Sequence, residues 1–133
     1  SDWAQLTCDV RHADPQLADR MVTELFAAVD DCAQRSRCEI RVVDRWVFGN
    51  ERFDPECIGL LRRAARGLGL PALDIVSQAG HDAYHVSKVA PTAMIFTPCV
   101  GGITHNNNER AELSRTEAGV NVLLNAVLAR ANR

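Results

Sequence analysis

The chain has 133 residues, of which 47% are hydrophobic and 24% charged, and its formal net charge is -2. This is an ordinary globular balance in a chain long enough to bury a core. Scattered basic residues without a basic stripe exclude a nucleic-acid-binding protein, and the lack of a long apolar run excludes a membrane span.

Residues 1–52 are predicted to form a strand, a helix and a second strand. The strands are expected at residues 3–12 and 38–48, and Gly49-Asn50 marks a turn after the second. Asp14 and Pro15 supply the cap and first position of the helix between them. Its apolar residues recur at helical spacing: Leu17, Met21, Leu25, Ala28 and Cys32.

Residues 53–133 are predicted to continue as helix, strand, helix, strand and helix. Asp54 and Pro55 repeat the cap signature, and Gly69 closes the helix that they open. The remaining elements are expected at residues 73–77, 82–88, 91–100 and 117–131. The apolar residues of the last helix are Val120, Leu123, Leu124, Val127 and Leu128. This order favours an α/β fold with a parallel sheet, whose strands are covered on both faces.

Two glycine-containing loops follow strands of the predicted sheet, and each carries a histidine. His81 follows Gly80 in the first loop, and His105 follows Gly101-Gly102 in the second. Because the carboxyl ends of parallel strands meet at one edge of a sheet, the two imidazoles are expected to face a common cleft. The alternative is that loop carbonyls satisfy both histidines.

Two other arrangements of reactive side chains occur in the sequence. His81 and His85 have the i, i+4 spacing of a zinc-binding helix, but the glutamate which that motif requires is an aspartate here. Cys99 with His105 resembles a nucleophilic pair, without a thiolate-activating feature. Five cysteines without a CxxC pair instead indicate reduced thiols in a cytoplasmic protein: Cys8, Cys32, Cys38, Cys57 and Cys99.

Arg11 ends the first predicted strand, on the same face as Asp9 because side chains alternate along a strand. Such an arginine can hold a substrate carboxylate through two hydrogen bonds. The alternative is a surface arginine paired with Asp9 or Asp14, and the spacing alone favours that alternative.

Three motifs occur together in one order: residues 79–83 (AGHDA), 91–96 (PTAMIF) and 102–106 (GITHN), the last followed by Glu109. They resemble the hydantoinase/carbamoylase branch of the M20 metallopeptidase-like amidohydrolases. Residues 9–11 resemble the Asp-x-Arg strand of that family's lid domain. One departure is Gln78, which stands where the family has a glycine.

The resemblance implies a fragment of a metal-dependent amidohydrolase that cleaves linear C–N bonds of N-carbamoyl amino acids or allantoate. Residues 1–52 would be the second half of a ferredoxin-like lid and dimerisation domain, and residues 53–133 the C-terminal part of the catalytic α/β domain. A homodimer is implied. Ser1 in place of Met is expected of a cut or processed piece, and no signal peptide is recognised at the start.

The resemblance also implies roles for single residues. His105 would be one ligand of two divalent metal ions, zinc or else manganese, cobalt or nickel. His81 would contact the substrate and stabilise the oxyanion, with Gly80 beside it. Arg11 would bind the substrate carboxylate, and Asn106 and Glu109 would order the loop around His105.

The family's other metal ligands and its proton-shuttling glutamate have no counterpart in this sequence. The chain alone is therefore expected to bind no metal tightly and to be inactive. The alternative function is that of a catalytically inactive relative which acts as a binding or dimerisation module.

Overall fold

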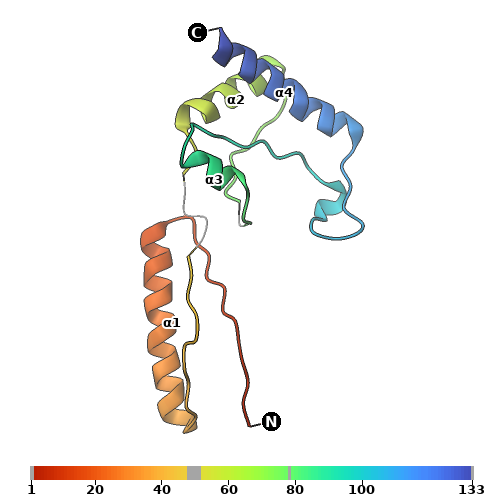
Figure 1. The fold of residues 1–133 in the computed structure, drawn as a ribbon. Coiled ribbons are helices and arrows are strands. Elements are labelled where there is room, and N and C mark those ends of the chain that lie inside the picture. The colour runs from red at the N-terminus through yellow and green to blue at the C-terminus, as the bar shows by residue number, and fades with distance from the viewer. Residues whose placement is uncertain (1, 48–51, 78, 133) are drawn as a thin grey trace. The chain divides into compact units, whose positions relative to one another are not determined.

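A computed structural model describes residues 2–47, 52–77 and 79–132 (Figure 1). Its contacts divide the chain into two compact units. Unit 1 comprises Ser1–Asn50 with Val76–Ala79, and unit 2 comprises Glu51–Ile75 with Gly80–Arg133. The turn predicted at Gly49-Asn50 lies outside the described residues, and the division of the chain between residues 52 and 53 stays a prediction.

Unit 1 is built on one long helix, α1 (Pro15–Ser36). The Asp14 side chain accepts a hydrogen bond from the Gln16 backbone N–H at 2.9 Å, and Pro15 occupies the first turn. The first backbone N–H groups of a helix lack intrahelical acceptors; Asp14 provides an acceptor for one of them, and Pro15 has no N–H to satisfy. The predicted helix is therefore confirmed. No described residue of unit 1 is buried.

The predicted strands are wrong for the part of the chain that the structure describes. Residues 2–12 and 38–47 run opposite to α1 in Figure 1, yet neither is a strand. The same holds for the strands predicted at residues 73–77 and 91–100. A strand needs a neighbour in register to complete its hydrogen-bonded ladder. Among the described residues, the nearest approach to such a ladder is an isolated antiparallel bridge between Cys99 and Ala111.

Unit 2 begins with α2 (Pro55–Gly67), whose two ends follow from its sequence. At the start, the Asp54 side chain accepts a hydrogen bond from the Cys57 backbone N–H at 2.7 Å. At the end, Gly69 has a φ of 67° and its N–H donates to the Arg66 carbonyl at 3.0 Å. The Leu70 N–H donates to the Ala65 carbonyl at 2.9 Å. This pair of bonds is a Schellman cap, so the prediction that Gly69 closes the helix is confirmed.

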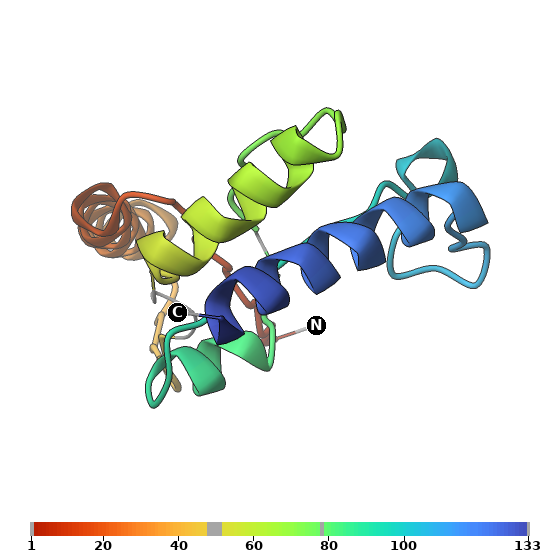
Figure 2. The same ribbon diagram turned by 90° about the horizontal axis from the view of Figure 1, so that it is seen from above.

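The core of unit 2 lies where α2 contacts α4 (Leu113–Ala131) (Figures 1 and 2). An ion pair of 3.0 Å between Glu56 and Arg130 joins the two helices. The buried residues of the unit are few and mostly small: Leu60, Ala65, Tyr84, Val122 and Ala126. Short side chains allow two helix backbones to approach each other closely.

The final helix differs from the prediction in its start and in its packing face. It begins at Leu113, four residues before the predicted start. Val122 and Ala126 are its buried residues, whereas the predicted apolar face is 50–57% exposed: Val120, Leu123, Leu124, Val127 and Leu128. The predicted face carries more large apolar residues, but Val122 and Ala126 are the residues of this helix that the fold buries.

Two short helices and one extended segment complete unit 2. The short helices are α3 (Ala83–Ser87), close to the predicted residues 82–88, and η1 (Val100–Gly102). The extended residues 91–98 join them, and the Thr92 carbonyl accepts a hydrogen bond from the Asp54 N–H at 2.8 Å. None of the described helices combines the length and apolar character needed to cross a bilayer.

Candidate functional site

His81 lies in a group of aromatic rings, which we call the His81 cluster: Phe53, His81, Tyr84 and Phe96. The imidazole is 5.6 Å from the Tyr84 ring and 5.5 Å from the Phe96 ring, at interplanar angles of 62° and 65°. Phe53 stacks on the Tyr84 ring, with the two ring centroids 5.4 Å apart and an interplanar angle of 17°. Edge-to-face pairs at these distances are favourable because the positive edge of one ring meets the negative face of the next.

The backbone around α3 sets the position of His81. Its carbonyl accepts a hydrogen bond from the Tyr84 N–H at 3.0 Å, which closes the turn that leads into α3. Tyr84 is buried and His81 is half-buried. Since α3 begins at Ala83, His81 precedes the helix and does not share a helical face with His85. The zinc-binding helix weighed from the sequence is therefore not formed here.

His105 lies in a closed loop between residues 99 and 111. The Cys99–Ala111 bridge and a 2.8 Å hydrogen bond from the Val100 N–H to the Arg110 carbonyl form the neck of this loop. Gly101 and Gly102 have φ angles of 65° and 68°, a conformation in which a side chain is disfavoured. The glycine pair thus permits the sharp reversal that leads to His105.

Glu109 holds the backbone of His105 in place. His105 has a φ of 54°, which is uncommon for a residue other than glycine. Its N–H donates to Glu109 Oε2 at 2.8 Å. The Cys99 thiol is 3.8 Å from Glu109 Oε1, so its contact is with this carboxylate rather than with the His105 imidazole. This arrangement argues against the pair of Cys99 with His105 as a nucleophilic centre.

Asn106 orders the same loop through its own two oxygens. Its side-chain oxygen accepts a hydrogen bond from the Asn108 N–H, and its carbonyl accepts one from the Glu109 N–H, both at 2.9 Å. Asn106 and Glu109 therefore stabilise the loop that carries His105. Whether they do so for a metal ligand stays a prediction.

The structure does not bring His81 and His105 together. The loop at residues 103–109 lies at the N-terminal end of α4, whereas α3 lies toward the other end of α4 (Figures 1 and 2). The prediction of a common cleft relied on neighbouring strands, and the described residues form no sheet that would align the two loops. A shared site stays a prediction for a longer protein.

Arg11 lies in unit 1 and pairs with Asp9. The Arg11 Nε atom is 2.9 Å from each carboxylate oxygen of Asp9, and its Nη2 atom also contacts that carboxylate. The hydrogen bonds from Arg11 lower the pKa of Asp9, and those to Asp9 raise the pKa of Arg11. Both side chains are more than half exposed. The structure thus contains the ion pair that the spacing favoured, with the guanidinium held in one orientation.

The remaining predicted residues lie near these two loops or outside the description. Gly80 is exposed and directly precedes His81. Gln78, the departure from the family pattern, lies outside the described residues. Within the described ranges, no three side chains of His, Cys, Asp or Glu converge as metal ligands would.

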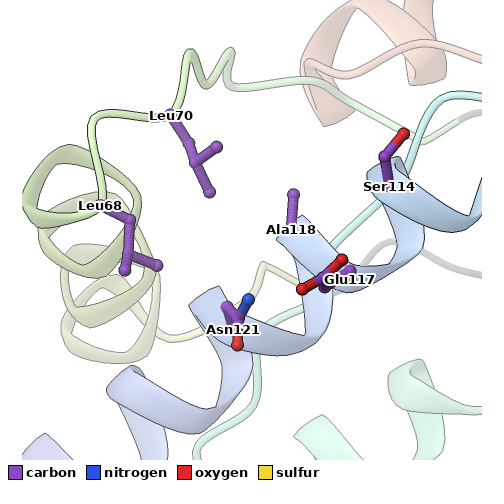
Figure 3. A pocket seen from close by; sticks show the side chains of 6 residues that line it. All are labelled: Leu68, Leu70, Ser114, Glu117, Ala118 and Asn121. Atoms are coloured by element: carbon purple, nitrogen blue, oxygen red, sulfur yellow. The ribbon is translucent and has the colours of Figure 1, made fainter.

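A separate shallow pocket of about 230 Å³ lies between the end of α2 and the first half of α4 (Figure 3). Two leucines at the Schellman cap and four residues of α4 line it: Leu68, Leu70, Ser114, Glu117, Ala118 and Asn121. It contains none of the residues to which the sequence motifs assign a role.

Comparisons with known proteins match nearly the whole chain. The sequence model of peptidase family M20/M25/M40 matches residues 8–129. The chain is 40% identical over 124 residues to N-carbamoyl-L-amino-acid amidohydrolase from Rhizobium meliloti, covering 92% of this chain and 29% of that protein. It is 28% identical over 126 residues to allantoate amidohydrolase from Bacillus subtilis, covering 90% of this chain and 29% of that protein.

Solved structures agree with the sequence relatives. A hydantoinase/carbamoylase family amidase from Burkholderia multivorans is 42% identical with a TM-score of 0.86, over 92% of this chain and 30% of that one. An amidase of the same family from Burkholderia ambifaria is 38% identical with a TM-score of 0.78, over 90% of this chain and 28% of that one. These neighbours support the α/β fold class. The chain spans less than a third of the length of these relatives.

Proposed function

The chain belongs to peptidase family M20/M25/M40, and from this we propose that a protein containing it hydrolyses a linear C–N bond in an N-carbamoyl amino acid or in allantoate. The resemblance to the hydantoinase/carbamoylase branch, drawn from the three motifs, is confirmed by the relatives and structural neighbours. The observation that carries the proposal is the 40% identity to an N-carbamoyl-L-amino-acid amidohydrolase across nearly the whole chain.

In this proposal His81 contacts the scissile carbonyl and stabilises the negative charge that develops on its oxygen. A preorganised donor aimed at the developing oxyanion is among the strongest single contributions to such a reaction. The half-buried position of His81 supports the role, because an imidazole held partly out of water interacts more strongly with charge. Gly80, which carries no side chain, would let substrate approach the backbone beside it.

Arg11 binds the substrate carboxylate in the same proposal. Support for this role comes from the resemblance of residues 9–11 to the family's Asp-x-Arg strand and not from the observed ion pair. Asp9 occupies the guanidinium edge formed by Nε and Nη2, so the substrate carboxylate would pair with the edge formed by Nη1 and Nη2. The first part of the chain would then act as a lid that brings Arg11 to the substrate.

His105 is the metal ligand that this chain would contribute in the same proposal. Its imidazole would hold one of two divalent ions, and Glu109 and Asn106 would keep the loop in place. The described residues do not fit such a centre by themselves, because no three ligating side chains converge. The other ligands and the general base would have to come from outside this chain.

The exposed apolar residues of unit 1 favour association as a second function. Four of its large side chains are 74–87% exposed: Trp3, Leu6, Trp46 and Val47. Exposed apolar surface of this kind marks a contact with other protein. We therefore propose a homodimer, and a binding or dimerisation role for this chain if it acts without the rest of a catalytic domain.

The test is an assay of the whole protein that contains this chain. Zinc, manganese, cobalt or nickel is added, and ammonia release is followed with N-carbamoyl amino acids and with allantoate. We expect turnover that His105→Ala abolishes and that His85→Ala, on the exposed side of α3, leaves intact. Failure to hydrolyse any of these substrates, or full activity in His105→Ala, would contradict the proposal.

A further inference from the structure

We propose that Tyr84 and Phe96 are positioning residues for His81, holding its imidazole in one orientation, with Phe53 supporting Tyr84 from behind. The inference rests on the proposed function, since that function gives His81 a substrate to act on. It adds three aromatic residues to the reaction, none of which would itself touch the reacting atoms.

The rings come from three separate segments of unit 2. Phe53 precedes α2, Tyr84 lies in α3, and Phe96 lies in the extended residues 91–98. The imidazole meets both the Tyr84 and the Phe96 ring edge-to-face, at centroid distances within 0.1 Å of each other, 5.6 and 5.5 Å. A ring that meets two differently placed neighbours at a steep angle cannot rotate without losing one of the contacts.

Tyr84 is the fixed member of the cluster. Its side chain is only 8% exposed, and its ring is stacked on Phe53. Its N–H also donates to the His81 carbonyl, so backbone and side chain of the same residue fix His81. Phe96 is 44% exposed and provides the second ring in contact with the imidazole. His81 itself stays half-buried, so the cluster restrains the imidazole without enclosing it.

This arrangement predicts an effect on turnover rather than on substrate affinity. Each edge-to-face pair favours the observed ring orientation by a factor on the order of 3 to 10. When one ring is lost, the imidazole spends more time in other rotamers, and a smaller fraction of bound substrate meets a correctly oriented donor. Affinity is expected to change little, because the carboxylate contact is assigned to Arg11 in the other unit.

The experiment uses the whole protein that contains this chain, with histidine labelled with ¹³C at Cε1. The His81 signal is the one that disappears in His81→Gln, and His12, which is exposed and has no role in the proposed reaction, provides a reference signal. Phe96→Leu and Tyr84→Leu remove a ring, whereas Phe96→Tyr and Tyr84→Phe keep it. Phe96→Leu is the safer variant, because Phe96 is more exposed than the buried Tyr84. Phe53→Leu is the matched control that removes a ring without a direct contact to His81.

We expect the ring currents of its neighbours to displace the His81 signal from the position of a free histidine, and the signal to move toward that position in both leucine variants. The kcat should fall on the order of 3- to 10-fold in these variants, with KM nearly constant. Both ring-keeping variants should restore the signal and kcat, and Phe53→Leu should have a smaller effect on each.

Two results would overturn the inference. One is a His81 signal that does not move when either ring is removed. The other is a shifted signal with unchanged kcat, which would mean that the rings only pack. If the wild-type protein hydrolyses none of the substrates, the proposed function fails. An unmoved signal then refutes the His81 cluster as well, whereas a moved signal confirms that Tyr84 and Phe96 lie against His81 in the whole protein.

Discussion

Gly119 of α4 lies so close to Thr97 that a β-carbon built on it would be 2.6 Å from the Thr97 Cγ2 atom. The next nearest atom, Ile95 Cγ2, would be 3.9 Å away. Glycine inside a helix costs about 0.5–1 kcal/mol relative to alanine. The close approach of the extended residues 91–98 to α4 explains why this helix nevertheless contains one.

Gly119→Ala should therefore destabilise unit 2. The added methyl group must displace Thr97, and overpacking of this kind costs about 1–3 kcal/mol. Thr97→Ser removes the obstructing methyl group and should recover most of that loss in the double variant. Chemical denaturation of the wild type, the two single variants and the double variant provides the measurement.

Gly59→Ala is the matched control for that substitution. Its β-carbon would meet only the end of the flexible Arg63 side chain, at 3.4 Å. The helix propensity of alanine should then stabilise α2 by up to about 1 kcal/mol. A Gly119→Ala variant as stable as the wild type would show that segment 91–98 does not pack against α4 as described.

Arg11→Lys should raise KM in the whole protein. Lysine keeps the positive charge but cannot form the two parallel hydrogen bonds that a guanidinium makes with a carboxylate. Loss of one charge-assisted hydrogen bond corresponds to a rise in KM of about tenfold or more. Steady-state kinetics with an N-carbamoyl amino acid measure it. Asp9→Asn, which only loosens the orientation of Arg11, should give a smaller rise, and an unchanged KM in Arg11→Lys would remove Arg11 from the binding site.

Cys57 should require a higher pH than an ordinary thiol to react with alkylating reagents. Burial raises the pKa of its thiol, and the Asp54 carboxylate beside it raises this pKa further. A raised pKa leaves less thiolate, which is the reactive form, at any given pH below it. The pH dependence of Cys57 labelling by iodoacetamide, followed by mass spectrometry, should have its midpoint above the ordinary thiol value. Asp54→Asn keeps the helix cap, removes the charge and should lower this midpoint; a midpoint that does not move would exclude Asp54 as a cause.

Glu109→Ala should release the backbone of His105. The carboxylate of Glu109 accepts the His105 N–H at 2.8 Å, and its removal leaves that amide bonded to water. Amide hydrogen exchange at His105 should become faster by roughly tenfold, the equivalent of one hydrogen bond. Glu109→Gln retains an acceptor, so its exchange rate at His105 should lie between those of the wild type and Glu109→Ala. Asn106→Ala is the control, because it should accelerate exchange at Asn108 instead.

The purified 133-residue chain should not hydrolyse N-carbamoyl amino acids or allantoate. It contributes one matching metal ligand, His105, and no counterpart of the family's proton-shuttling glutamate. Loss of general acid–base help alone lowers a rate on the order of 10²–10⁴-fold. Ammonia release is measured with zinc, manganese, cobalt or nickel added. Metal-dependent turnover that His105→Ala abolishes would show that the chain holds a complete site.

Features set by neighbouring residues were predictable from the sequence. Asp14 and Asp54 cap their helices as expected, and Gly69 ends α2, because each acts on backbone groups within a few residues. The strands were not predictable in this sense. An apolar or alternating run is compatible with a strand, but a ladder forms only when a second segment lies beside it.

The candidate site shows the same division between local and distant effects. The hydrogen bond from His105 to Glu109 spans four residues, and the motif that contains both residues indicated that they belong together. The His81 cluster joins residues 53, 84 and 96, and no spacing rule relates these positions. The stacked rings and the close contact at Gly119 depend on how the segments of unit 2 pack, which periodicity does not describe.

The contact between α2 and α4 has a consequence for synthesis. Residues 68–112 separate the two helices, yet the buried residues of unit 2 lie mostly on their shared interface. On the ribosome, α2 must wait unpaired until the whole of α4 has emerged, and closing so long a loop is slow compared with forming either helix. Until α4 has emerged, Leu60 of α2, which is buried in the folded unit, remains exposed to chaperones.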